Sequence, residues 1–168
     1  MTKQFRKDND LEKIVVNIGV GRARTLPQFD EKVLPEVAAS LAAVTGQKAA
    51  SRAARKAVAS FKTRAGDVVG LQVTLRGVRM REFLTKLIRI VLPRVKDFRG
   101  LDRSNVDARG NLNVGIREQY VFPEINPEKS KVSFGLQITV VPRMQNRARA
   151  IAFYESIGMP LKKEGVKG

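Results

Sequence analysis

The 168-residue sequence has no cysteine, no histidine and no tryptophan. Without cysteine and histidine it can form no disulfide, has no thiol nucleophile and lacks the usual zinc ligands. It also lacks the side chain that most often serves as a general base near neutral pH. No stretch approaches 18 uninterrupted apolar residues, and the N-terminus has no apolar signal core. We therefore expect a soluble intracellular protein with no membrane partner.

Recognisable catalytic patterns are missing as well. The candidate carboxylate pairs are Asp8/Asp10, Asp102/Asp107 and Glu124/Glu128. All of them lie in polar segments beside lysine or arginine, as solvated loop acids do. Gly19-Val20-Gly21 begins like a dinucleotide-binding fingerprint, but Arg24 occupies the third glycine position and no βαβ pattern follows. The sequence predicts no catalytic residue, no metal site and no cofactor. Lysine-based catalysis stays open, although no lysine is singled out, and an enzyme acting on RNA is one alternative.

Acidic residues are half as numerous as basic ones. The 16 Asp and Glu stand against 32 Lys and Arg, which gives a formal net charge of +16. No acid occurs between residues 48 and 64, whose cations are Lys48, Arg52, Arg55, Lys56, Lys62 and Arg64. A second basic stretch from Arg76 to Arg99 contains only two acids, Glu82 and Asp97. Nucleic acid, an anionic membrane surface or an acidic protein would suit such charge, and we interpret the partner as RNA phosphate.

The apolar periodicity predicts an α+β fold with a mostly antiparallel sheet of four to five strands and about three helices packed on one face. We expect strands over residues 11–21, 61–64, 68–76, 112–116 and 134–140. We expect helices over residues 30–45, 78–92 and 145–157. Residues 61–64 and 68–76 would form a hairpin around Ala65-Gly66-Asp67, while residues 49–60 fit a short strand or a short helix equally well. Asp30 would cap the first helix, Pro35 would delay or kink it and Gly46 would end it.

The domain organisation predicted from the sequence is simple. A flexible N-terminal arm covers residues 1–10, a single domain covers residues 11–160, and a flexible basic tail covers residues 161–168. Residues 101–111 and 126–133 are expected to be exposed loops. The alternation of the strands leaves Asn17, Gln72 and Thr74 facing away from the core.

Residue chemistry favours structured RNA over DNA as the partner. The sequence contains no zinc finger, no helix-turn-helix with a basic recognition helix and no heptad zipper. It also has no aromatic pair on a strand for base stacking, so recognition of RNA shape and backbone is the better interpretation. A DNA-binding protein or a nucleic-acid chaperone that uses charge alone is the alternative.

Short motifs along residues 11–160 resemble those of one protein family. They are Lys13-Ile14-Val15-Val16-Asn17-Ile18-Gly19-Val20-Gly21, Thr45-Gly46-Gln47-Lys48, Phe61-Lys62-Thr63-Arg64, Val73-Thr74-Leu75-Arg76-Gly77, Leu92-Pro93-Arg94-Val95, Asp97-Phe98-Arg99-Gly100, Gly110-Asn111, Gly115-Ile116, Glu118-Gln119, Phe122-Pro123-Glu124-Ile125 and Gly158-Met159-Pro160. In this order they resemble the family of the fifth large-subunit ribosomal protein, in its bacterial form. Family members usually begin with an extra helical segment before the first strand, and this sequence is short there.

The resemblance implies a scaffold protein of the central protuberance of the cytoplasmic ribosome. It implies that the chain binds 5S rRNA through Asn17, Gln47 and Thr74, with Lys13, Lys48 and Arg76 as phosphate partners. The other partners implied are 23S rRNA, P-site tRNA, neighbouring large-subunit proteins of the central protuberance and a small-subunit head protein across the subunit interface.

Two further contacts follow from the resemblance. The hairpin tip over residues 62–70, with Lys62, Arg64, Gly66 and Asp67, would face P-site tRNA. We expect Asp67 to weaken that contact slightly, because a carboxylate repels the tRNA backbone. The loops at residues 102–111 and 126–133 would form an intersubunit bridge, with Arg103, Asp107 and Arg109 as the residues involved.

Overall fold

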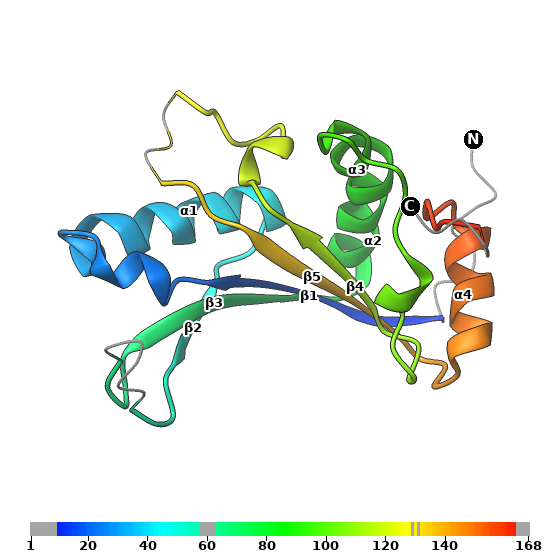
Figure 1. Ribbon diagram of the computed structural model, residues 1–168, viewed down its shortest axis with the longest axis horizontal. Helices are drawn as coiled ribbons and strands as arrows, with labels where there is room; N and C mark the ends of the chain where they lie inside the picture. Colours follow the sequence, from blue (N-terminus) through cyan, green and yellow to red (C-terminus); the bar gives the residue numbers. More distant parts are fainter. Residues whose placement is uncertain (1–9, 58–62, 129, 131, 164–168) are drawn as a thin grey trace. The chain divides into compact units, whose positions relative to one another are not determined.

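The computed structural model describes residues 10–57, 63–128, 130 and 132–163. Its five strands are β1 (Leu11–Gly19), β2 (Ala50–Ala53), β3 (Val68–Leu75), β4 (Leu112–Ile116) and β5 (Leu136–Pro142). They form one antiparallel sheet in the order β2-β3-β1-β5-β4 (Figure 1), accompanied by the helices α1, α2 and α4. The predicted α+β class is therefore confirmed. Most of the predicted N-terminal arm and basic tail, residues 1–9 and 164–168, lies outside the described residues.

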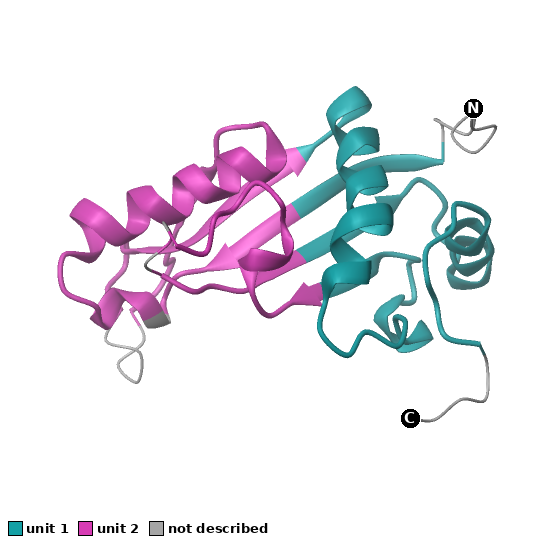
Figure 2. Cartoon of the chain, turned by 90° about the horizontal axis from the view of Figure 1, so that it is seen from above, with its two compact units in different colours: residues 1–15, 75–114, 138–168 teal, residues 16–74, 115–137 magenta. Residues whose placement is uncertain are grey.

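The chain divides into two compact units, coloured separately in Figure 2. Unit 1 comprises Met1–Val15, Leu75–Val114 and Ile138–Gly168, and unit 2 comprises Val16–Thr74 and Gly115–Gln137. Unit 2 therefore contains α1 and β2, and unit 1 contains α2 and α4. Each unit is described below by itself.

The strands β1, β3 and β5 bury alternate residues, as their sequences predict. Ile14, Val16 and Ile18 in β1 are fully buried, whereas Asn17 and Gly19 are exposed. In β3 the buried residues are Leu71, Val73 and Leu75. In β5 they are Leu136, Ile138 and Val140. Because side chains alternate between the two faces of a strand, burial of one face leaves the opposite face available for polar side chains.

The partner of β3 differs from the prediction. Residues 50–53 form β2, and Ala50 lies opposite Gln72 while Ala53 lies opposite Val68 in an antiparallel register. The predicted hairpin between residues 61–64 and 68–76 is therefore wrong, and the undecided stretch 49–60 contains a strand. Of the predicted strand 61–64, Phe61 and Lys62 lie outside the described residues, and the remainder belongs to the connection between β2 and β3.

This connection between β2 and β3, residues 54–67, is closed at its base by main-chain hydrogen bonds. The Ala54 N–H donates to the Asp67 carbonyl at 2.8 Å, and the Gly66 N–H donates to the Ala54 carbonyl at 2.9 Å. The turn at Arg64–Asp67 forms because Gly66 adopts a φ of +93°, which glycine reaches without strain.

The helix α1 (Leu34–Thr45) begins later than expected from Asp30, the residue predicted to cap it. A π-helical turn, Phe29–Val33, precedes it, and Pro35 sits in its first turn. Asp30 is therefore not its N-cap, whereas the late start expected from Pro35 is confirmed. Gly46 ends α1 with a φ of +68°, and its N–H donates to the Ala42 carbonyl at 2.8 Å.

The predicted helix over residues 78–92 is observed as three consecutive pieces. These are α2 (Gly77–Lys86), a π-helical segment (Leu87–Val91) and α3 (Leu92–Arg94), which contains Pro93. Met80, Phe83, Leu84, Leu87 and Val91 are buried as the apolar stripe predicts, but Ile88 is only half-buried. The wider π turn changes the angular spacing of residues, so the stripe does not continue unchanged through it.

The helix α4 (Arg147–Ser156) begins where the side chain of Asn146 accepts a hydrogen bond from the Arg149 N–H at 3.0 Å. Ile151, Tyr154 and Ile157 are buried, and Gly158 follows the helix with a φ of +82°. The predicted exposed loop at residues 101–111 is only partly exposed, because Leu101 and Val106 are buried on either side of a 3₁₀ turn at Arg103–Asn105.

Candidate nucleic-acid interface

The residues predicted to bind 5S rRNA fall in both units. Asn17, Gln47, Lys48 and Thr74 belong to unit 2, whereas Lys13 and Arg76 belong to unit 1. Asn17 and Thr74 lie on the sheet face that is opposite to the core, where Asn17 is exposed and Thr74 is half-buried. Gln47 and Lys48 lie in the segment between α1 and β2, where Gln47 is half-buried and Lys48 is exposed.

Gly70 shows how closely the strands of this face approach one another. A Cβ atom on Gly70 would lie 3.2 Å from the Ile18 carbonyl oxygen, 3.8 Å from the Arg52 Cβ and 4.0 Å from the Asn17 Oδ1. Asn17 of β1 and Arg52 of β2 therefore flank the same point of β3. Gln72 and Thr74 follow Gly70 at intervals of two residues and lie on the same face. We refer to Asn17, Arg52, Gln72 and Thr74 as the polar sheet face.

Two hydrogen bonds organise the polar sheet face. The Arg52 Nε donates to the Gln72 Oε1 at 2.5 Å, which aligns the guanidinium along the sheet. The Gln47 Nε2 donates to the Thr74 carbonyl at 3.2 Å, which brings together two residues that are far apart in sequence. Thr45 supports this turn, because its hydroxyl contacts the Leu41 carbonyl at 2.7 Å and the Gln47 carbonyl at 3.1 Å. The family resemblance named Gln47 and Thr74 as RNA contacts but did not predict the hydrogen bond between them. It also did not name Arg52, whose place on this face depends on the register of β2, which could not be predicted.

In unit 1, Lys13 and Arg76 share one carboxylate. The Glu12 Oε1 lies 3.2 Å from the Lys13 Nζ and 3.7 Å from the Arg76 Nη1, and Arg76 also donates to the Glu12 carbonyl at 3.3 Å. The hydrogen bond and charge of Lys13, with a smaller contribution from Arg76, lower the pKa of the Glu12 carboxyl. The two cations predicted to contact phosphate are therefore already arranged around an anion of the chain itself.

The residues predicted to face tRNA belong to the connection between β2 and β3. Lys62 lies outside the described residues, and Arg64 and Gly66 are exposed. Asp67 is different, because its Oδ2 lies 2.5 Å from the Arg24 Nη1 and accepts a hydrogen bond from the Arg64 N–H at 2.6 Å. These partners, Arg24 foremost, lower the pKa of Asp67. Arg24 entered the sequence reasoning only as the residue that breaks a glycine motif, so its role as a partner was missed.

The residues predicted for the intersubunit loop have different roles. Arg103 is bonded within unit 1, to the Lys162 carbonyl through Nε at 3.0 Å and to the Glu155 carboxylate through Nη2 at 2.6 Å. Asp107 accepts hydrogen bonds from the N–H groups of Arg109 and Asn111 at 2.8 and 2.9 Å. Arg109 itself is exposed. Arg103 and Asp107 therefore shape the loop, and Arg109 extends from it.

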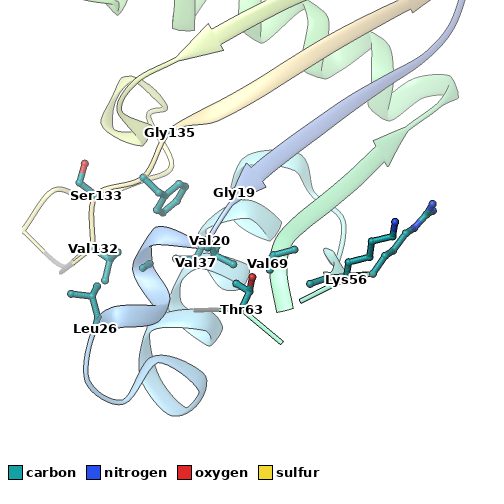
Figure 3. Close-up of a pocket in the computed structure, with 15 residues that line it drawn as sticks. Gly19, Val20, Leu26, Val37, Lys56, Thr63, Val69, Val132, Ser133 and Gly135 are labelled. Carbon is teal, nitrogen blue, oxygen red and sulfur yellow. The ribbon is translucent and has the colours of Figure 1, made fainter. Parts of the chain in front are cut away.

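An open groove of about 970 Å³ lies in unit 2 beside the connection between β2 and β3 (Figure 3). Its lining is mainly apolar, with Val20, Leu26, Val37 and Val69 among the contributing residues. Lys56 also lines it, and Figure 3 shows this side chain extending away from Val20 and Val37. The walls include two segments, the 3₁₀ turn Arg22–Thr25 with its flanks and the connection itself.

The described residues contain no cluster of three or more acidic side chains that could hold a metal ion. In the same part of the chain, no helix has the length and apolar character needed to cross a lipid bilayer.

Comparison with known proteins identifies the family. The chain matches the family described as "Ribosomal protein L5" over residues 9–64, and it matches the C-terminus of the same ribosomal family over residues 68–161. It is 43% identical to the large ribosomal subunit protein uL5 of Leptospira biflexa over 92% of this chain and 82% of that protein. It is 46% identical to uL5 of Thermotoga maritima over 97% of this chain and 89% of that protein, and 46% identical to uL5 of Spiroplasma kunkelii over 91% and 83%.

These matches confirm the resemblance carried by the motifs, and they cover nearly all of the chain. Members of this family are structural components of the large ribosomal subunit and not enzymes. Their partners are rRNA and other ribosomal proteins, and their place is the ribosome of the cytoplasm. The chain therefore belongs to the uL5 family of ribosomal proteins, as a structural constituent of the large subunit.

Proposed function

We propose that this chain binds 5S rRNA through the polar sheet face of unit 2, together with Gln47 and Lys48. The observation that carries the proposal is the position of Asn17 and Arg52 on either side of Gly70, with Gln72 and Thr74 following on the same face of β3, away from the core. Amide and hydroxyl groups can bond the 2′-hydroxyls and phosphates of a folded RNA, and a fixed guanidinium adds a planar phosphate contact.

Lys13 and Arg76 would add phosphate contacts from unit 1. In the complex, each would exchange its present contact with Glu12 for an RNA phosphate. Such contacts strengthen binding without reading sequence, so they supply affinity and a dependence on salt. The polar sheet face would then supply the shape selectivity that distinguishes 5S rRNA from other polyanions.

The remaining contacts in the proposal involve loops. The connection between β2 and β3 would reach P-site tRNA with Lys62 and Arg64. The loop at residues 102–111 would contribute Arg109 to a bridge with a protein of the small-subunit head, held in shape by Arg103 and Asp107. 23S rRNA and neighbouring proteins of the central protuberance complete the set of proposed partners.

A competition binding experiment tests the 5S rRNA proposal. The Kd of the protein is measured for 5S rRNA, tRNA and duplex DNA of matched length at several salt concentrations. We expect selective binding of 5S rRNA that persists at moderate salt. Equal affinity for all three polyanions, collapsing together with salt, would instead support a charge-only chaperone and contradict the proposal.

Single substitutions locate the surface. Asn17→Ala, Arg52→Ala and Thr74→Ala should each weaken 5S rRNA binding by about 5- to 30-fold, as expected for losing about 1–2 kcal/mol of polar contact. Arg149→Ala is the matched control for Arg52→Ala, because it removes one exposed arginine from α4 of unit 1, a residue that has no part in the proposed contact. Unchanged 5S rRNA affinity for all three variants would show that another surface binds the RNA.

A further inference from the structure

Arg24 and Asp67 form an ion pair within unit 2. The Arg24 Nη1 lies 2.5 Å from the Asp67 Oδ2, and each side chain is only 23% exposed. The same Asp67 oxygen accepts the hydrogen bond from the Arg64 N–H at 2.6 Å. One carboxylate therefore joins the 3₁₀ turn Arg22–Thr25 to the turn that ends the connection between β2 and β3. Because the pair is only partly hydrated, it is screened by salt less than a surface pair.

The main chain on both sides of the pair is held in place. The Val20 N–H donates to the Val69 carbonyl at 2.9 Å, and the Ala23 N–H donates to the Val20 carbonyl at 3.0 Å. On the other side, the Asp67 carbonyl accepts the Ala54 N–H at 2.8 Å. The ion pair thus connects two anchored segments, which both contribute to the walls of the open groove.

The connection carries several cations and one acid, so the ion pair of that acid with Arg24 affects the charge that the connection presents. Between residues 48 and 67, Asp67 is the only acid, and Arg55, Lys56 and Arg64 are exposed cations. The carboxylate lies against Arg24 and the Arg64 N–H, so the negative charge is neutralised inside the protein. The expected repulsion between Asp67 and tRNA is therefore countered by Arg24.

We propose that Arg24 is a positioning residue for the RNA contact made by three described cations of the connection between β2 and β3, Arg55, Lys56 and Arg64. Through Asp67 it fixes the Arg64–Asp67 turn, and the turn fixes the direction in which Arg64, Arg55 and Lys56 are presented. This inference rests on the proposed function, in which the connection faces P-site tRNA.

Charge neutralisation and positioning make different predictions for paired substitutions. Arg24→Ala removes both effects, because it leaves the Asp67 carboxylate unpaired and the turn untied. The double variant Arg24→Ala/Asp67→Ala restores electrical neutrality but leaves the turn untied. If positioning matters, the double variant stays impaired, whereas neutralisation alone would let it recover.

The test uses large ribosomal subunits that lack this protein and are reconstituted with each variant. The affinity of the resulting ribosomes for P-site tRNA is measured. We expect ribosomes with Arg24→Ala to bind tRNA about tenfold more weakly, and those with the double variant to remain at least about fivefold weaker, because both variants leave the turn untied. Arg24→Lys should recover part of the loss, and Asp67→Asn keeps an acceptor for the Arg64 N–H if Asp67→Ala does not fold. Arg117→Ala, which removes another exposed arginine of unit 2, should match the wild type.

Two results would overturn the inference. Recovery of wild-type tRNA affinity by the double variant would leave neutralisation as the whole effect of Arg24. Wild-type affinity for Arg24→Ala would show that the pair has no bearing on the contact. The 5S rRNA affinity of each variant, which positioning of the connection should leave unchanged, separates a local effect from general unfolding. If subunits with and without the wild-type protein bind tRNA equally, the proposed tRNA contact itself fails, and the inference fails with it.

Discussion

The hydroxyl of Tyr154 bonds to the carbonyl oxygen of Gly110 at 2.8 Å. It also lies 3.2 Å from the Val140 carbonyl, and the tyrosine ring is fully buried in unit 1. The Tyr154 hydroxyl therefore links the helix α4 to the strand β5 and to the loop before β4. Burial raises the pKa of Tyr154 above its ordinary value, so the hydroxyl stays protonated and able to donate at neutral pH.

Tyr154→Phe should lower the free energy of unfolding by about 1–3 kcal/mol, because it leaves two buried carbonyls without this donor. This difference between the variant and the wild type should shrink above about pH 10. There the tyrosine ionises in the unfolded wild-type protein but not in the folded one, which lowers the free energy of unfolding of the wild type. Urea unfolding at pH 7 and about pH 10.5 checks both statements. Tyr120→Phe is the matched control, since Tyr120 is half-buried and forms no hydrogen bond among the described residues. Equal losses for the two variants would contradict the assigned role.

Gly110 should tolerate no side chain. Its φ is +86°, and an added Cβ would lie 2.7 Å from the Ala150 Cβ. Gly110→Ala should therefore cost about 2–4 kcal/mol from backbone strain and overpacking together. Gly21→Ala is the control, because Gly21 has a φ of −57° and open space around its Cβ position. That variant should lie within about 1 kcal/mol of the wild type or be more stable, which thermal unfolding would measure.

Much of this fold could be predicted from the period of the apolar residues. Apolar residues alternate along β1, β3 and β5, so the existence of these strands and the side chains that they bury follow from the sequence alone. β2 could not be predicted, because its four residues are all exposed and three of them are alanine or serine with no period. Its strand state comes from pairing with β3, a tertiary effect that overrides the local preference of alanine for helix.

Strand alternation predicts only the part of the candidate interface that lies on the strands, whereas Gln47 and Lys48, in a turn, were named from the family resemblance alone. Asn17 and Thr74 could be assigned to the face away from the core because their neighbours are buried. Arg24 and Asp67 could not be paired, since both lie in turns where no period relates them. Gln119 shows the same limit: it is fully buried, and only the structure reveals that its amide bonds to the Val132 carbonyl at 2.7 Å and to the Phe134 N–H at 2.9 Å.

Asp107 should stabilise its loop only while it is ionised. Burial alone would raise the pKa of Asp107, but hydrogen bonds from Asn111 and Arg109 outweigh burial and lower it. A lowered pKa in the folded state means that the stabilisation is present above the unfolded pKa of about 3.9 and is lost as the pH falls through the folded value. Asp107→Ala should therefore cost about 1–2 kcal/mol at pH 7 and progressively less as the pH falls below about 3.9.

Asp102→Ala provides the comparison for Asp107→Ala. Asp102 lies in the same loop and pairs with Lys162 at 3.2 Å, but its side chain is 58% exposed, so its removal should cost less than about 1 kcal/mol. Urea unfolding of both variants from about pH 2.5 to pH 7 measures the difference. A loss for Asp107→Ala that does not vary with pH would contradict the ionic origin of its contribution.

Glu12 should lower the affinity for RNA, because its carboxylate pairs with Lys13 and Arg76 in the free protein. Glu12→Gln should raise the affinity for 5S rRNA by about 2- to 10-fold at low salt, since neither cation must then leave a carboxylate to contact phosphate. The plot of log affinity against log salt should become steeper by up to about one unit, as two less-neutralised cations release more counterions. Glu118→Gln makes the same charge change at an exposed acid that forms no ion pair among the described residues. If the two variants bind 5S rRNA with the same affinity and the same salt dependence, net charge alone explains the gain and Lys13 and Arg76 are not the phosphate contacts.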